Sequence, residues 1–187
     1  MGLKHQRAWF AGAALWGFAE ATTFFVVPDV LLTAAVLMLG VAAALRFAGA
    51  AAIAAVVGGM VMLAWGAGDV DGARGFLLAI PLIGGDLLAR VQTDIAGAWP
   101  ANLTIGAITG APYKIYAVEA GAAGITPLAF AVVSFAARLA RFTLVIALFA
   151  LGLRLLRLVG GARFGLAFLI VVWVGVYGIY GFIRVHS

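Results

Sequence analysis

Cysteine is absent from this sequence of 187 residues, and histidine and serine are scarce. Without cysteine the chain has no disulfide, no thiolate metal ligand and no cysteine nucleophile. His5 and His186 stand near the two ends, so the central region offers no zinc-binding pair and no catalytic histidine. Ser134 and Ser187 are the only serines, and neither has a candidate base near it. These absences predict that the protein is not an enzyme and uses no metal or cofactor.

Charged residues are also few. Only 10% of the residues are Asp, Glu, Lys or Arg, against about 25% in an ordinary soluble domain, and 66% are hydrophobic. This composition predicts an all-α polytopic membrane protein with a single domain, because five or six apolar elements of about 20 residues use most of the length. The basic residues are scattered and form no stripe with aromatic residues, which excludes nucleic acid as a partner.

Three long apolar stretches predict transmembrane helices. Residues 47–68 and 164–183 carry no charge, and each is close to the ~20 residues that cross a bilayer. Trp173 and Tyr177 lie toward the end of the second stretch, as in an aromatic belt at a membrane interface. A third stretch covers about residues 126–152.

Two further apolar segments, residues 16–39 and 99–123, are interrupted by proline and by charge. Proline removes a backbone donor and clashes with the preceding turn, so each segment is predicted to form two half-helices that meet at a bend. The predicted hinges are Pro28, Pro112 and Gly121. Such bends are tolerated in a membrane only where protein or a wet cavity surrounds them, which predicts re-entrant or discontinuous helices.

A polar loop and an amphipathic helix are predicted between these two parts of the chain. Asp69, Asp71 and Arg74 mark the loop. Residues 75–98 follow, and their apolar side chains recur on one helical face. The apolar positions are Leu87, Leu88, Val91 and Ile95. We expect this helix to lie in the membrane interface.

The chain resembles itself when it is shifted by 84 residues. The shift aligns three pairs of residues: Pro28 with Pro112, Gly40 with Gly124, and Gly68 with Gly152. Both units have the order broken segment, short connection, long helix, which predicts an inverted repeat of the kind found in transporters. The expected parts are repeat 1 at about 15–68, the interfacial helix at about 75–98, repeat 2 at about 100–153 and a final transmembrane helix at about 163–183.

The basic residues outside the apolar segments predict the topology. If the first broken segment is re-entrant, six of them share one face, which the positive-inside rule assigns to the cytoplasm together with the N-terminus. They are Lys4, Arg7, Arg46, Arg154, Arg157 and Arg163. If that segment instead spans the membrane, Arg46 lies on the opposite side.

Six ionisable residues fall within the apolar segments. The acidic ones are Glu20, Asp29 and Glu119, and the basic ones are Lys114, Arg138 and Arg141. Two interpretations remain open. The opposite charges form structural ion pairs, or the basic residues bind a phosphate headgroup while the carboxylates couple its movement to protons.

The two broken segments carry a family resemblance. The run Gly-Phe-Ala-Glu-Ala-Thr-Thr-Phe-Phe-Val-Val-Pro-Asp-Val-Leu-Leu at residues 17–32, with Gly-Ala-Pro-Tyr-Lys at 110–114 and Glu-Ala-Gly at 119–121, resembles the DedA family of bacterial membrane proteins, also called the VTT or SNARE-associated domain. The resemblance covers roughly residues 15–155. It implies two facing re-entrant segments and the movement of undecaprenyl phosphate or phospholipids between leaflets, driven by the proton-motive force.

Residue by residue, the resemblance gives the acidic positions to Glu20 and Asp29 and the basic position to Lys114. Commoner family members have Gly-Arg-Phe shortly before the proline, where this chain has Ile-Thr-Gly at residues 108–110, so a divergent subfamily is expected. Arg138 and Arg141 are expected to supply the missing charge.

The expected function is transport, by flipping or scrambling, of a phosphate-bearing lipid across the bacterial cytoplasmic membrane, with proton coupling. The expected partners are anionic membrane lipids, and the oligomeric state is open. A proton-coupled exchanger of small ions or drugs and a non-transporting membrane scaffold remain as alternatives.

Overall fold

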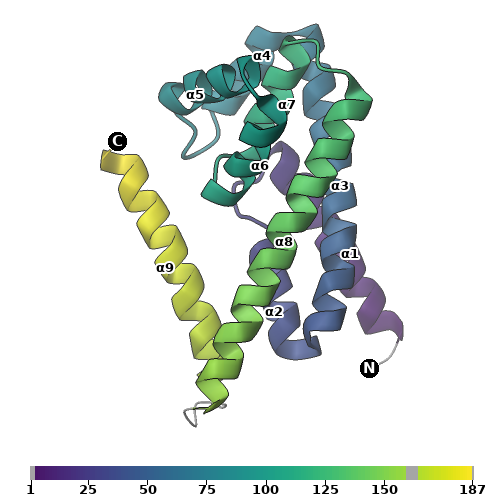
Figure 1. Cartoon of the computed structure of the whole chain (residues 1–187), viewed down its shortest axis with the longest axis vertical. Coiled ribbons are helices and arrows are strands. Elements are labelled where there is room, and N and C mark those ends of the chain that lie inside the picture. Colours follow the sequence, from purple (N-terminus) through teal and green to yellow (C-terminus); the bar gives the residue numbers. More distant parts are fainter. Residues whose placement is uncertain (1–2, 159–163, 187) are drawn as a thin grey trace.

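The computed structural model describes residues 3–158 and 164–186, except for the side chains of 3–5, 180 and 183–186, and this part of the chain is entirely helical (Figure 1). Its helices are α1 (Leu3–Thr22), α2 (Asp29–Leu39), α3 (Val41–Gly68), α4 (Val70–Leu78), α5 (Gly85–Ala96), α6 (Trp99–Thr109), α7 (Tyr113–Ala122), α8 (Pro127–Leu158) and α9 (Gly165–His186).

Two helices in the described part, α3 and α8, are long and apolar enough to cross a membrane. They have 28 and 32 residues, which is about 42 and 48 Å at 1.5 Å per residue. The helices α1, α7 and α8 pack on α3. Large apolar side chains also cover the outside of the bundle, since Leu15, Leu128 and Val171 are 71%, 76% and 68% exposed. A surface of this kind is unfavourable in water.

Each interrupted segment forms two half-helices joined at a bend, as its proline predicts. The first bend lies between Thr22 and Asp29, and the second between Thr109 and Tyr113. Pro28 and Pro112 each stand immediately before the second half-helix, where a missing N–H is tolerated. The first half-helix is longer than expected, because α1 begins at Leu3 instead of residue 16.

Gly121 is not a hinge, in contrast to the prediction. It lies inside α7, and a Cβ at this position would collide with the backbone oxygen of Leu63. Its role is therefore the close approach of α7 to α3. The chain turns instead at Gly124, whose positive φ of 70° favours glycine.

The 84-residue shift matches the starts of the second half-helices but not every helix bound, since Gly68 ends α3 whereas Gly152 lies inside α8. The half-helices α2 and α7 begin at Asp29 and Tyr113, and the glycines that follow them, Gly40 and Gly124, both have positive φ. The two bends meet beside the middle of α8 (Figure 1), where Arg141 hydrogen-bonds to residues of both broken segments.

The connection between the two units differs from the expected loop and single helix. Residues 70–78 are helical, and Asp69 caps α4 by accepting a hydrogen bond from the N–H of Gly72 at 2.9 Å. The predicted helix at 75–98 is divided between α4 and α5, because Pro81 and the positive φ of Leu82 interrupt it.

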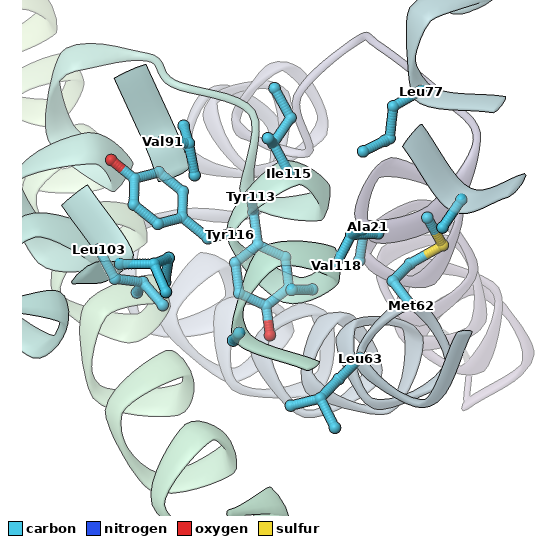
Figure 2. Close-up of a cluster of buried hydrophobic side chains, with 14 of the residues drawn as sticks. Ala21, Met62, Leu63, Leu77, Val91, Leu103, Tyr113, Ile115, Tyr116 and Val118 are labelled. Carbon is cyan, nitrogen blue, oxygen red and sulfur yellow. The ribbon is translucent and has the colours of Figure 1, made fainter. Parts of the chain in front are cut away.

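The apolar face of α5 is buried, as its pattern predicts. It packs against α6 and α7, and Asp94 accepts a hydrogen bond from the hydroxyl of Tyr116 of α7 at 2.6 Å. Figure 2 shows the apolar cluster around Tyr113 and Tyr116 of α7, to which Val91 of α5 and Leu103 of α6 contribute. The helix α5 is thus attached to the second broken segment, α6–α7.

A second apolar cluster is built from α1, α2, the first half of α3 and the second half of α8. Along α8, the first cluster ends at Ala137 and the second begins at Phe142. Arg138 and Arg141 of α8 therefore lie at the boundary between the two clusters.

The last helix, α9, packs against α2 and α8 and then diverges from the bundle (Figure 1). The predicted final transmembrane helix begins at residue 163, which is outside the described residues, and α9 begins at Gly165. With 22 residues, α9 is shorter than α3 and α8.

Candidate functional site

Five of the six ionisable residues of the apolar segments gather where the two bends meet. Glu20 is in the last turn of α1, Asp29 is the first residue of α2 and Lys114 is the second residue of α7. Arg138 and Arg141 lie one turn apart on α8. Most of this charge is buried, since Asp29 is 0% and Lys114 2% exposed. The sequence-predicted residues thus form one central cluster.

Arg141 joins the two broken segments. Its Nε and Nη2 donate to Oδ2 of Asp29 at 3.1 and 2.7 Å, and its Nη1 donates to the backbone oxygen of Ala107 at 2.6 Å. The other carboxylate oxygen of Asp29, Oδ1, is buried and has no hydrogen-bond partner among the described residues. The carboxylate therefore retains an unused acceptor.

Arg138 forms a different pair. Its Nη1 lies 2.6 Å from Oε2 of Glu20, and its guanidinium carbon lies 4.1 Å from the centre of the Tyr113 ring. Neither Oε2 of Glu20 nor Nε of Arg138 has hydrogen-bond geometry with any described residue. The contact is therefore ionic, supplemented by a cation–π interaction.

Lys114 is the cation without a carboxylate. Its Nζ donates to the backbone oxygen of Phe24 at 2.7 Å, and no carboxylate in the described part of the chain lies within salt-bridge distance of it. The central cluster thus holds three cations and two carboxylates. Lys114 also stands at the N-terminus of α7, where the helix dipole adds positive potential. The cluster is electrostatically suited to one additional anion.

Glu119 does not belong to the central cluster. Arg74 donates to its two oxygens from Nε at 2.9 Å and from Nη2 at 2.7 Å, and both residues line a separate pocket of about 360 Å³. The hydrogen bond to Glu119 raises the pKa of Arg74 above its ordinary value, so this arginine stays charged. The apolar segments contain equal numbers of acidic and basic residues, but these charges do not balance within the central cluster.

A pocket of about 430 Å³ opens onto the central cluster. Its charged lining consists of Glu20, Asp29, Lys114 and Arg141, whereas Arg138 is not part of the lining. Most of the remaining wall is apolar and comes from residues 80–83, α8 and α9. Four of the candidate residues therefore face the pocket, and Arg138 does not.

Two aromatic residues of α9 belong to the site, although the sequence indicated only a membrane-interface belt for them. Trp173 donates from Nε1 to Oγ1 of Thr33 at 2.9 Å, and the Tyr177 hydroxyl accepts from the N–H of Val27 at 3.0 Å. Both aromatic residues line the central pocket. Their spacing of four in an otherwise apolar helix is the signal that places them on one face.

Comparison with known proteins gives no relative, since the chain matches no family model and neither a curated protein nor a solved structure matches it significantly. Functional inference therefore depends on the geometry of the central cluster and its pocket.

Proposed function

We propose that this protein is a DedA-like integral membrane transporter that moves a phosphate-bearing lipid, such as a polyprenyl phosphate or a glycerophospholipid, across the bacterial cytoplasmic membrane with proton coupling. The observation that carries the proposal is the surplus positive charge of Lys114 at the meeting point of the two bends, beside a pocket with apolar walls.

The distribution of apolar and basic residues supports the membrane location. The apolar exterior favours lipid over water. Arg7 and Arg46 lie near the starts of α1 and α3, and Arg154 and Arg157 lie near the end of α8. These helix ends are together at one end of the molecule (Figure 1), as one cytoplasmic face requires. With that orientation, α1–α2 and α6–α7 enter from opposite sides as an inverted pair of re-entrant hairpins.

The chemistry of the cluster favours a phosphate group. Arg141 provides a forked donor and Lys114 provides a compact charge, and both α2 and α7 begin at the central cluster, with Asp29 and Lys114 in their first turns. Half-helices with this arrangement bind anionic groups in membrane transporters.

Proton coupling follows from competition for Arg141. A bound phosphate takes donors that Asp29 now uses. A buried carboxylate that loses its cation is more stable with a proton, so anion binding and proton uptake occur together. Glu20 has the same relation to Arg138, one step further from the pocket.

A non-transporting scaffold is the second candidate, and the ion pairs favour it. Each of Glu20, Asp29 and Glu119 has an arginine partner, as expected if the charges only hold the helices in register. A scaffold, however, gives no reason for the burial of Lys114 without a carboxylate.

Reconstitution in liposomes separates the candidates. We expect the parent to move a fluorescent phosphate-bearing lipid between leaflets, and Lys114→Gln to abolish this movement. Arg90→Gln is the matched control, because Arg90 is exposed on α5 and lines neither pocket. Movement of soluble ions without lipid would indicate the exchanger, and movement of neither would indicate the scaffold.

A further inference from the structure

The residues that line the central pocket fall into two chemically different groups, which we name its charged end and its apolar end. Its charged end is formed by Lys114, Arg141 and the two carboxylates. Its apolar end, which we name the α8–α9 slot, is formed by Val145, Leu148 and Phe149 of α8 and by Phe168, Val172 and Val176 of α9. The α9 residues recur at spacing four, so they form one face of that helix. One cavity thus connects a cationic site with a hydrocarbon-like wall.

The slot is held in place relative to the charged end. The hydrogen bonds of Trp173 and Tyr177 attach α9 to Thr33 of α2 and to Val27 of the first bend. Both attachment points are within a few residues of Asp29, which Arg141 binds. The apolar wall of α9 is therefore fixed at the part of the molecule that carries the charge.

We propose that the α8–α9 slot binds the hydrocarbon chain of the ligand, while Lys114 and Arg141 bind its phosphate. This inference rests on the proposed function and adds to it the part of the protein that holds the hydrocarbon chain of the lipid. The charged end alone suits an anion, and the continuous apolar wall has no polar partner to offer a hydrophilic ligand.

The size of the cavity agrees with partial enclosure of such a ligand. A volume of about 430 Å³ is at the small end of the range for ligand pockets. It holds a headgroup and the first part of one chain, so the rest of the chain lies outside the cavity. The resemblance to DedA proteins covers roughly residues 15–155, so α9 lies outside it. The binding role proposed for α9 is therefore not taken from that resemblance.

The test compares ligands that share a phosphate but differ in chain. Binding of inorganic phosphate, butyl phosphate and octyl phosphate to the full-length protein is measured in detergent by isothermal titration calorimetry. In the parent, affinity should rise with chain length, by up to about 4-fold for each methylene that enters the slot.

Two matched variants locate the chain. Val176→Trp fills the slot, and Val174→Trp adds the same ring two residues away, where the side chain is 67% exposed and does not line the pocket. Val176 is 47% exposed, so both substitutions avoid the packed core. We expect Val176→Trp to weaken octyl phosphate binding by about 10-fold or more, because two or more methylenes are displaced. Partition of the ligand into detergent is the same for both variants and cancels in their ratio.

Inorganic phosphate distinguishes this inference from the proposed function. Its affinity should be equal in Val176→Trp and Val174→Trp, which also shows that the charged end is intact. Equal octyl phosphate affinity in the two variants, with phosphate binding retained, would overturn the slot and leave the proposed function standing. Failure of the parent to bind any of the three phosphates would overturn both.

Discussion

The Asp29–Arg141 pair makes an asymmetric prediction about stability. Both residues line the pocket, but Asp29 is fully buried, whereas the Arg141 side chain is 19% exposed. The substitution Arg141→Gln leaves a buried, unpaired carboxylate, which costs about 3–5 kcal/mol of folding free energy. Asp29→Asn leaves an arginine that keeps its bond to Ala107 and reaches the pocket, so we expect a cost of about 1–2 kcal/mol.

The double variant Asp29→Asn/Arg141→Gln removes both charges. Loss of a whole buried pair is often neutral, so the double variant should be more stable than Arg141→Gln alone. For a chain of this size, a cost of 1 kcal/mol lowers the melting temperature by about 2–4 °C, which predicts a decrease of about 6–20 °C for Arg141→Gln.

The assay is thermal unfolding in detergent, with exposed Arg90→Gln as the control that should not shift. The parent, the three variants and the control are also tested for lipid movement in liposomes. We expect the double variant to be folded and inactive, because the pocket has lost its forked donor. The reasoning is refuted if the double variant is less stable than Arg141→Gln, or if Asp29→Asn costs as much as Arg141→Gln.

Two further predictions use other parts of the chain. Because the native sequence has no cysteine, single cysteines at positions 7, 46 and 71 report topology in sealed vesicles. Positions 7 and 46 should label from one side of the membrane and position 71 from the other. Labelling of position 46 from the same side as position 71 would contradict the re-entrant hairpin. Glu119→Gln should lower the free energy of unfolding by about 1–3 kcal/mol, since Arg74 loses its charged acceptor. The affinity for phosphate in calorimetry should not change, because Glu119 does not line the central pocket. Weaker phosphate binding would show that the two pockets are coupled.

Local signals predicted much of the fold. Proline located both bends to within a residue of a helix start, and the apolar spacing of residues 87–95 identified the buried face of α5. The cap at Asp69 was also present in the sequence, as an acidic residue directly before a helix, but its charged neighbours favoured a loop. Pro81 likewise marks the break between α4 and α5, which the periodicity of the flanking residues concealed.

The parts that sequence reasoning missed depend on contacts between distant segments. Glu119 is separated by 45 positions from Arg74, and no local pattern predicts which of several cations reaches a buried carboxylate. The contacts of α9 with the first bend join residues that are 140 and 150 positions apart. The pairing of Glu20 with Arg138 and of Asp29 with Arg141 was open for the same reason, since charge counts do not specify partners.

Arg138 and Arg141, three residues apart on α8, have different roles in the proposed transport. Arg138 is 4% exposed, lies over the Tyr113 ring and does not line the pocket, so a ligand cannot contact it without displacing α7. Arg141 lines the pocket, and Asp29 retains a free acceptor oxygen for a proton. Exchange of partners therefore begins at the Asp29–Arg141 pair. Glu20 faces the same pocket, but its change of partner requires Arg138 to move. The Glu20–Arg138 pair therefore responds second, and the Asp29–Arg141 pair determines whether a phosphate is bound.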